Sequence, residues 1–260
     1  MKSKILISTG GSGGHVIPAT TIHDHLKDNY DIIISSDFRG LKYLDTKLYN
    51  IKVIDTPKLN KTILLPLSIL KVIYFTLTSL VFLKKQKIQI LISTGGYMSL
   101  PLCIAAKILN IKIYLLEPNM VIGRANKFFL RFCEKIICYS DNIIGFHEDF
   151  KSKLKILNPL IRKIYYDEKL EEHNNNKFTL LIIGGSQGAN IFDKILHKSI
   201  IEISKIKTLK VIHQTNKKNI DTLKYLYSEN KIDNIVFSFD QNLNLLIQQA
   251  DLCITRAGAT

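Results

Sequence analysis

The feature that most constrains this chain is a glycine-rich stretch close to its start. The apolar, β-branched run Ile5 to Ile7 precedes residues 10–15, Gly-Gly-Ser-Gly-Gly-His, and a helical apolar pattern begins at Val16. This order predicts a strand, a tight turn and the N-terminus of a helix. Glycine permits positive φ and a close approach of the backbone to a ligand. The free N–H groups and the positive dipole end of a helix start suit a phosphate.

His15 lies at this predicted helix start and is a candidate general base. The positive end of a helix dipole disfavours the imidazolium form, so the ring is expected to be neutral near pH 7. A histidine that only caps the helix is the simpler alternative.

Other phosphate-binding motifs fit the chain less well. In the dinucleotide fingerprint G-x-G-x-x-G, counted from Gly11 and Gly13, the third glycine falls on Val16. A nicotinamide-dinucleotide site nevertheless stays possible, because Asp37 ends the next apolar run, where the acid that binds the ribose often lies. The P-loop pattern G-x-x-x-x-G-K-[ST] does not occur.

The composition bounds the class of protein. With 260 residues, 46% of them hydrophobic, the chain can bury a sizeable core and form two domains. A formal net charge of +14 and a pI of about 9.5 favour anionic partners, although part of the excess reflects a general use of Lys in an Ile- and Asn-rich chain. No signal peptide is visible. No metal spacing or CxxC occurs among the cysteines, which are interpreted as buried thiols in a reducing cytoplasm: Cys103, Cys133, Cys138 and Cys253.

Apolar runs alternate with helical patterns along the whole chain, which predicts an α/β fold with parallel sheets covered on both faces. A polar boundary zone at 140–177 separates two halves, and each half opens on a glycine-rich loop. Two Rossmann-like domains, 1–157 and 158–260, are therefore expected to face a cleft. The expected strands are 4–8, 31–35, 51–54, 89–93, 112–116, 135–138, 178–183, 209–213, 235–238 and 252–255. The expected helices include 17–28, 40–48, 66–83, 99–109, 122–133 and 191–204.

The segment 63–83 is apolar apart from Thr, Ser and Lys71, and further lysines follow at 84, 85 and 87. Its length would allow it to span a bilayer, but Pro66 and the central Lys71 argue against spanning. Two alternatives stay open. It is either a helix that covers the core or a monotopic helix whose apolar residues enter the membrane interface while its lysines meet anionic headgroups.

A second glycine-rich loop, residues 93–101, Ser-Thr-Gly-Gly-Tyr-Met-Ser-Leu-Pro, again lies between a predicted strand and helix. Two such loops on neighbouring strand ends would form a double anion cradle of the kind a pyrophosphate needs. A pair of tight turns without a ligand is the alternative.

Taken together, these motifs resemble the MurG family of glycosyltransferases in order and over essentially the whole chain. They are residues 10–15 with Pro18, residues 95–101, Gly-Arg-Ala-Asn-Lys at 123–127, Gly-Gly-Ser-Gln-Gly-Ala at 184–189, His-Gln at 213–214, and the stretch from Ala250-Asp251 to Arg-Ala-Gly-Ala at 256–259.

The resemblance implies a GT-B fold and an inverting transfer that requires neither metal nor cofactor. N-acetylglucosamine would pass from UDP-N-acetylglucosamine to the C4 hydroxyl of lipid I, undecaprenyl-pyrophosphoryl-N-acetylmuramoyl-pentapeptide, to give lipid II for peptidoglycan, and so serve cell shape and division. The implied location is peripheral, on the anionic cytoplasmic face of the inner membrane, with 63–83 as the contact. Nucleic acid is not an implied partner.

The resemblance also assigns roles to residues, with His15 as the base. The first domain would bind acceptor and membrane, and the second the UDP-sugar. The implied donor-binding residues are Ser12, Gly13, Gly14, Asn119, Arg162, Ser186 and Gln187. The implied acceptor-pyrophosphate residues are Gly10, Gly11, Gly13, Gly14, Gly95, Gly96, Tyr97 and Ser99. The family's Glu-Gln-Asn is Glu-Pro-Asn here at 117–119, and the arginine of its Asn-Pro-Val-Arg motif is displaced by one residue.

In the family, the chain continues beyond the motif at 256–258 with a helix that supplies further donor-binding residues. We therefore expect a second domain that is incomplete within residues 1–260. Two other functions stay open: a non-catalytic protein that binds lipid pyrophosphate and membrane, and a nicotinamide-dependent oxidoreductase. The non-catalytic protein would bind lipid I but not UDP-N-acetylglucosamine, whereas the transferase would bind both. Binding of NAD would support the oxidoreductase.

Because a parallel strand buried on both faces needs its covering helix, the strand 252–255 is expected to leave apolar surface open to water. We predict a folded N-terminal core, a less stable C-terminal half and no measurable transferase activity for residues 1–260. Limited proteolysis should cut first after about residue 160. Protease resistance of the whole chain as one unit, together with transfer to lipid I, would contradict this expectation.

Overall fold

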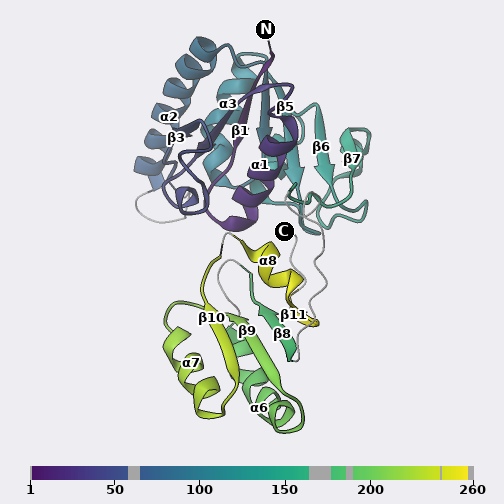
Figure 1. The fold of residues 1–260 in the computed structure, drawn as a ribbon. Coiled ribbons are helices and arrows are strands. Elements are labelled where there is room, and N and C mark those ends of the chain that lie inside the picture. The colour runs from purple at the N-terminus through teal and green to yellow at the C-terminus, as the bar shows by residue number, and fades with distance from the viewer. Residues whose placement is uncertain (1, 58–64, 164–176, 186–189, 241, 257–260) are drawn as a thin grey trace. The chain divides into compact units, whose positions relative to one another are not determined.

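The computed structural model describes residues 2–57, 65–163, 177–185, 190–240 and 242–256. The chain divides into two compact units, with the division after Lys163 (Figure 1). Each unit contains its own parallel sheet.

The sheet of the first unit has seven strands in the order β3-β2-β1-β4-β5-β6-β7, all parallel. Ile-rich runs form its central strands, because β-branched side chains suit a strand that is buried on both faces. The strands are β1 (Lys4–Ser8), β2 (Asp31–Ser36), β3 (Ile51–Val53), β4 (Ile90–Ser93), β5 (Lys112–Glu117), β6 (Lys135–Cys138) and β7 (Leu154–Ile156).

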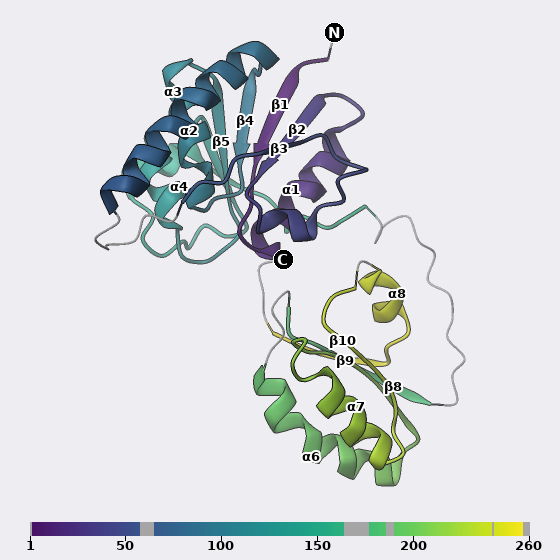
Figure 2. The same ribbon diagram turned by 90° about the vertical axis from the view of Figure 1, so that its left-hand side faces the viewer.

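Helices cover both faces of this sheet (Figure 2). Alternate residues of β1 point in opposite directions, so Ile5 and Ile7 pack with Val16 of α1, whereas Leu6 belongs to a core with Leu83 of α2. The helices are α1 (Gly13–Leu26), α2 (Leu65–Gln86), α3 (Leu100–Ile108) and α4 (Arg124–Phe129), with 3₁₀ turns η1 (Gly40–Tyr43), η2 (Tyr97–Ser99) and η3 (Glu148–Lys153).

The strand order places the two glycine-rich loops of the first unit side by side. β1 pairs with β4, and Ser8 is the register partner of Ser93, so both loops leave the sheet at the same edge. From β1 the chain runs outward to β2 and β3, and from β4 it runs the other way to β5. This is the topological switch point of a doubly wound sheet, where such folds bind ligands.

The second unit has a four-stranded parallel sheet in the order β10-β9-β8-β11. Its core lies between this sheet and two helices, α6 and α7, and includes Val211, Leu223 and Tyr227. Its elements are β8 (Phe178–Ile183), α6 (Asn190–Ile206), β9 (Leu209–Gln214), α7 (Ile220–Glu229), β10 (Asp233–Phe237), α8 (Leu243–Gln248) and β11 (Leu252–Thr255).

These elements confirm the expected α/β fold, and several expectations need correction. The helix predicted at 40–48 is only the turn η1, because the Asp45 carboxylate accepts the Lys47 N–H at 2.8 Å and forms a competing local turn. α1 begins at Gly13 rather than at residue 17, α4 is shorter than 122–133, and β7 was not predicted.

One cysteine prediction is also wrong. Cys103, Cys133 and Cys138 are buried, and burial raises the pKa of the Cys103 thiol to about 12, but Cys253 is exposed. It lies on β11, an edge strand of the described sheet, where Leu252 is also half exposed.

Two buried carboxylates hold the loops of the first unit. The Asp37 side chain, which is fully buried, follows β2 and reaches across to the first glycine-rich loop. Its Oδ1 accepts the N–H groups of Gly11 at 2.7 Å and of Gly40 at 2.9 Å, and its Oδ2 accepts from Arg39 Nε at 3.0 Å. Because both oxygens are satisfied by these bonds, burial of the charge is compensated.

Glu117, 2% exposed at the end of β5, organises the loop before α4 in the same way. One carboxylate oxygen accepts from the Asn119 N–H at 3.2 Å and side-chain Nδ2 at 2.9 Å. The other accepts from the Gly123 N–H at 2.7 Å and from Asn126 Nδ2 at 3.0 Å. Four N–H groups therefore converge on one carboxylate.

Replacing Glu117 with Gln should destabilise the first unit, because an amide NH₂ would then face N–H donors. Each buried donor left without an acceptor costs about 1–3 kcal/mol. Urea unfolding measures the loss. The control is Glu148→Gln, which removes an exposed pair with Lys151 (3.2 Å) and should change stability by about 0–1 kcal/mol. Equal stability of the two variants would contradict the role of Glu117.

Candidate functional site

His15 lies in the first turn of α1 and is hydrogen-bonded to the second loop. Its Nδ1 lies 2.7 Å from the carbonyl oxygen of Thr94. A carbonyl only accepts, so Nδ1 carries the proton in this bond, and Nε2, which has no hydrogen-bond partner among the described residues, is the ring nitrogen that can accept a proton. The Thr94 hydroxyl in turn donates to Thr9 Oγ1 at 2.9 Å. The two loops are thereby joined, and the ring orientation is fixed.

Two glycines show why these loops need that residue type. Gly10 has a φ of +142°, and a Cβ there would lie 2.6 Å from Asp37 Oδ1. Gly96 has a φ of +85°, and a Cβ there would collide with Met98 Sδ. A side chain at either position would be strained and would push the loop away from its neighbour.

A cavity of about 780 Å³ opens beside the imidazole of His15. One part of its wall is polar and includes the second loop and the loop held by Glu117, whereas another part is apolar. The polar wall consists of His15, Gly95, Gly96, Tyr97, Glu117, Asn119, Gly123, Arg124 and Asn126. The apolar wall consists of Val72 on α2, Leu100 and Ile104 on α3, and Ala125 and Phe128 on α4.

The structure brings together many of the predicted site residues. His15, Gly95, Gly96, Tyr97 and Asn119 line the cavity. The other predicted residues of the first loop directly precede the histidine at the N-terminus of α1: Gly10, Gly11, Ser12, Gly13 and Gly14.

Ser99 is buried behind the second loop, where its hydroxyl donates to the Gly96 carbonyl at 2.7 Å. The Ser99 hydroxyl therefore holds the loop together and does not face the cavity.

Arg162 lies away from this group. The carbonyl of the preceding residue, Ile161, accepts from His25 Nε2 at 3.1 Å, and the following Lys163 pairs with Asp28 at 3.6 Å. This segment therefore runs along the C-terminal end of α1, and His25 is about 15 Å along the helix from His15. Ser186 and Gln187 lie outside the described residues.

Glu117 and Phe128 are the principal residues that the sequence did not single out. A signal for Glu117 existed, since an acid that ends a buried strand next to the switch point faces the ligand-binding edge. For Phe128 there was no such signal, because an aromatic residue in a helix is more often part of a core.

Asp37 bears on the nicotinamide alternative. Its carboxylate is buried and already bonded to Gly11, Gly40 and Arg39. A ribose-binding acid must offer an oxygen to the ribose hydroxyls. The environment of Asp37 therefore argues against a dinucleotide site.

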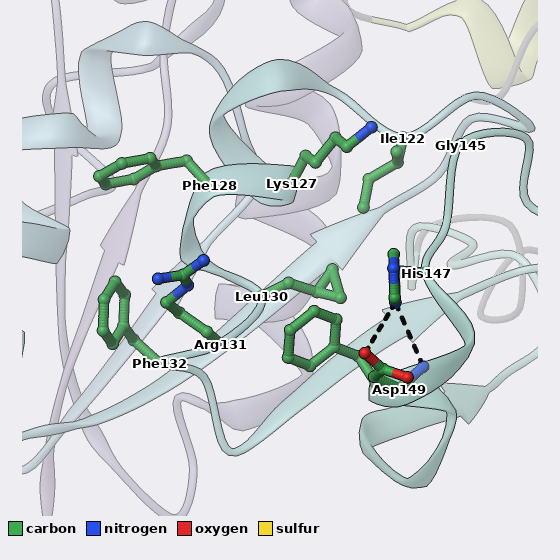
Figure 3. Close-up of a pocket in the computed structure, with 10 residues that line it drawn as sticks. Ile122, Lys127, Phe128, Leu130, Arg131, Phe132, Gly145, His147 and Asp149 are labelled. Atoms are coloured by element: carbon green, nitrogen blue, oxygen red, sulfur yellow. Dashed lines mark hydrogen bonds and ion pairs between the residues drawn. The ribbon is translucent and has the colours of Figure 1, made fainter.

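A second cavity, of about 500 Å³, lies next to α4, and Phe128 borders both cavities. Figure 3 shows Lys127 and Arg131 on one side of it and His147 and Asp149 on the other. The imidazole Nδ1 of His147 lies 3.2 Å from the Asp149 carboxylate. None of the predicted site residues lines this cavity.

α2 presents an apolar face to solvent. Along Pro66–Gln86 it is long and apolar enough to cross a membrane, and only 17% of its most apolar window is buried. Leu70, Leu77 and Val81 are 62%, 57% and 68% exposed. This exposure argues against the expectation of a helix that only covers the core, since such a helix would bury its apolar residues.

Among the described residues, no group of three or more His, Cys, Asp or Glu side chains is placed to hold a metal ion.

Family models match both halves of the chain. The N-terminal domain of glycosyltransferase family 28 matches residues 5–138, and the C-terminal domain of the same family matches residues 179–260. In the fold of the first unit, the first match covers β1 to β6, which include both glycine-rich loops.

Solved structures share this fold. Crystal structures of MurG from Acinetobacter baumannii (TM-score 0.70, 23% identity, 99% of this chain and 74% of that one) and of a UDP-GlcNAc 2-epimerase from Neisseria meningitidis bound to UDP-GlcNAc (TM-score 0.67, 13% identity, 98% and 78%) are similar. At these identities the likeness shows the fold, which is GT-B-like.

Relatives found by sequence share a higher identity with this chain than these structures do. A UDP-N-acetylglucosamine–N-acetylmuramyl-(pentapeptide) pyrophosphoryl-undecaprenol N-acetylglucosamine transferase of Pelagibacter ubique is 50% identical over an alignment of 261 positions, which covers 100% of this chain and 73% of the relative. A Wolbachia enzyme of the same name is 33% identical over 98% of this chain and 72% of its own length. The chain therefore belongs to glycosyltransferase family 28 and, within it, to the MurG family of N-acetylglucosaminyltransferases.

Proposed function

We propose that this chain forms the larger part of an enzyme that transfers N-acetylglucosamine from UDP-N-acetylglucosamine to the C4 hydroxyl of lipid I, with inversion, and so takes part in peptidoglycan synthesis and in cell shape and division. The names of its relatives supply the two substrates. The observation that carries the proposal is the free Nε2 of His15 beside a cavity that is polar along one wall and apolar along another.

His15 acts as the general base in this proposal. Its Nδ1–H is held by the Thr94 carbonyl, so Nε2 can accept the proton of the attacking hydroxyl. Nε2 faces the second loop, since a Cβ on Gly96 would lie 3.6 Å from it. An acceptor whose pyrophosphate occupies that loop would therefore place its sugar near the base.

The two glycine-rich loops bind the acceptor pyrophosphate. The first residues of α1 supply N–H groups that have no partner within the helix, together with the positive end of the helix dipole. Gly95, Gly96 and Tyr97 supply the other side. The apolar wall formed by Val72, Leu100 and Ile104 then suits the first isoprene units of the lipid.

Asn119, with Ser12, Gly13 and Gly14, contacts the donor. Because its Nδ2 is bonded to Glu117, Asn119 offers a sugar hydroxyl its Oδ1 as an acceptor. Ser186 and Gln187 complete the donor site in this proposal, with residues 1–157 as the acceptor domain and 158–260 as the UDP-sugar domain. Arg162 is left out of it, because its segment runs beside the C-terminal end of α1. No metal ion or cofactor takes part.

The exposed face of α2 lies in the interface of the cytoplasmic leaflet of the inner membrane. Its apolar side chains are exposed, and Lys84 and Lys85 in its last turn, with Lys87 just beyond, are also exposed. An apolar helix face flanked by lysines suits a monotopic contact with anionic lipid.

Replacing His15 with Ala should lower the rate of transfer by about 10²–10⁴, the usual contribution of a general base, and change UDP affinity only a few-fold. The assay uses lipid I in a chimera in which the C-terminal segment of the Pelagibacter relative follows residue 260. His147→Ala, an exposed histidine of the same unit, is the control. Near-normal turnover of the His15 variant would exclude it as the base.

Changing Lys84, Lys85 and Lys87 to Glu should weaken binding to anionic vesicles, because each basic residue near such a surface contributes about 1 kcal/mol. Sedimentation with phosphatidylglycerol vesicles measures the fraction of protein that is bound. The same charge change at Lys217, Lys218 and Lys224, exposed lysines of the second unit, is the control. Equal binding by both variants would contradict a membrane contact through α2.

A further inference from the structure

The second unit contains a buried cluster of titratable side chains that the proposed transfer does not use. Asp193 lies in the first turn of α6, His213 near the end of β9, and Tyr227 on α7. Nδ1 of His213 lies 2.8 Å from the Tyr227 hydroxyl, and its Nε2 lies 3.3 Å from Asp193 Oδ1. His213 and Tyr227 are fully buried, and the Asp193 carboxylate is 6% exposed.

The second carboxylate oxygen of Asp193 joins two further elements. It accepts from the Thr215 hydroxyl and from Asn219 Nδ2, both at 2.6 Å. Thr215 follows β9, and Asn219 is the N-cap residue of α7. One carboxylate therefore ties the first turn of α6 to the end of β9 and to the start of α7. Asn216 adds a side-chain bond to Asn190, the first residue of α6.

The protonation states in this cluster follow from burial. Burial raises the pKa of Tyr227, so its hydroxyl keeps its proton and can donate to Nδ1 of His213. Burial also lowers the pKa of His213, and the Asp193 charge opposes that effect. The neutral ring then turns Nε2–H toward Asp193.

The alignment of His213 with Asp193 is poor. Neither Nε2 nor Oδ1 has a hydrogen-bond partner among the described residues, although the two atoms are close. Electrostatic attraction across 3.3 Å therefore contributes more to this contact than a well-formed hydrogen bond. Among the described residues, two titratable groups face His213: Asp193 from α6 and Tyr227 from α7. A third titratable residue, His197 on α6, contacts the cluster only through the backbone, with Nδ1 3.3 Å from the Asp193 carbonyl oxygen.

We propose that Asp193 is a positioning residue: its buried carboxylate, with His213 as its partner, fixes the first turn of α6 in the orientation that donor binding requires. The inference rests on the proposed function in one respect, namely that Ser186 and Gln187, just before α6, belong to the donor site. The N–H groups that start a helix bind an anion only where they point at it, so the direction of the first turn matters.

A pH dependence follows from the lowered pKa of His213. Between that pKa and the ordinary value of about 6.5, the unfolded state binds more protons than the folded state, so stability rises with pH there. The contribution of the cluster is therefore fully present above about pH 6.5 and is lost as the pH falls below it. UDP affinity should fall over the same pH range. The variant His213→Gln should reduce the pH dependence of both the stability and the UDP affinity.

The decisive experiment compares hydrogen exchange in the whole chain for wild type, Asp193→Asn and Asp233→Asn at pH 7.5. The first variant keeps the shape of the side chain and removes its charge. The second removes an exposed carboxylate of the same unit that pairs with Lys177 at 2.9 Å. We expect amides of residues 190–197 to exchange at least tenfold faster in Asp193→Asn and unchanged in the control.

A milder variant, Thr215→Val, removes one donor to Asp193 without changing the shape of the side chain. It should give a smaller acceleration confined to the same peptide, and it replaces Asp193→Asn if that variant does not fold. UDP titration of the same proteins, at pH 7.5 and pH 5.5, then measures whether the first turn controls affinity.

The outcomes separate the two proposals. Unchanged exchange at 190–197, or equal acceleration across β8 and β9, would overturn the positioning role, since a residue that only stabilises the unit would loosen all of it. Absence of UDP binding by the wild type at both pH values would count against the proposed donor loop, and the exchange pattern would still decide the role of Asp193.

Discussion

The hydrogen bond between His15 Nδ1 and the Thr94 carbonyl is the interaction on which the site depends. It joins the start of α1 to the loop after β4, and it leaves Nε2 as the ring nitrogen that can accept a proton. The bond exists because β1 and β4 are neighbours at the switch point of the sheet, with Ser8 opposite Ser93. A different strand order would separate the histidine from the second loop and remove both effects.

Two buried carboxylates keep this arrangement in place. Asp37 binds the backbone of the first loop, and Glu117 binds the backbone before α4. Each accepts several N–H groups at once, which compensates the cost of burying a charge. In the second unit, the Asp193 carboxylate at the start of α6 accepts instead from two side chains, the Thr215 hydroxyl and Asn219 Nδ2, and its other oxygen lacks a well-aligned partner among the described residues. In each case a buried carboxylate holds a loop or the first turn of a helix in place.

The first unit combines such polar loops with an apolar surface that is not part of its core. α2 buries Ser79 and Leu83 against the unit and turns Leu70, Leu77 and Val81 outward. An exposed apolar face of this kind is costly in water and is typical of surfaces that contact a membrane or another protein. The cavity beside His15 is bordered by the same helix at Val72, so α2 contributes both to this cavity and to the exposed apolar face.

The sequence by itself determined the order of strands and glycine-rich loops, and from it the α/β class, because hydrophobic periodicity and glycine act locally. It also indicated His15 and the second loop as parts of one site, since both follow strands of a parallel sheet. It did not predict the turn at 40–43, where the Asp45 side chain competes with a helix, or the exposure of Cys253 on an edge strand. Only the tertiary structure decided which atom of His15 is free, that Asp37 is committed to Gly11, and that Arg162 lies beside the far end of α1. These facts depend on contacts between residues far apart in the chain, and no local pattern specifies such contacts.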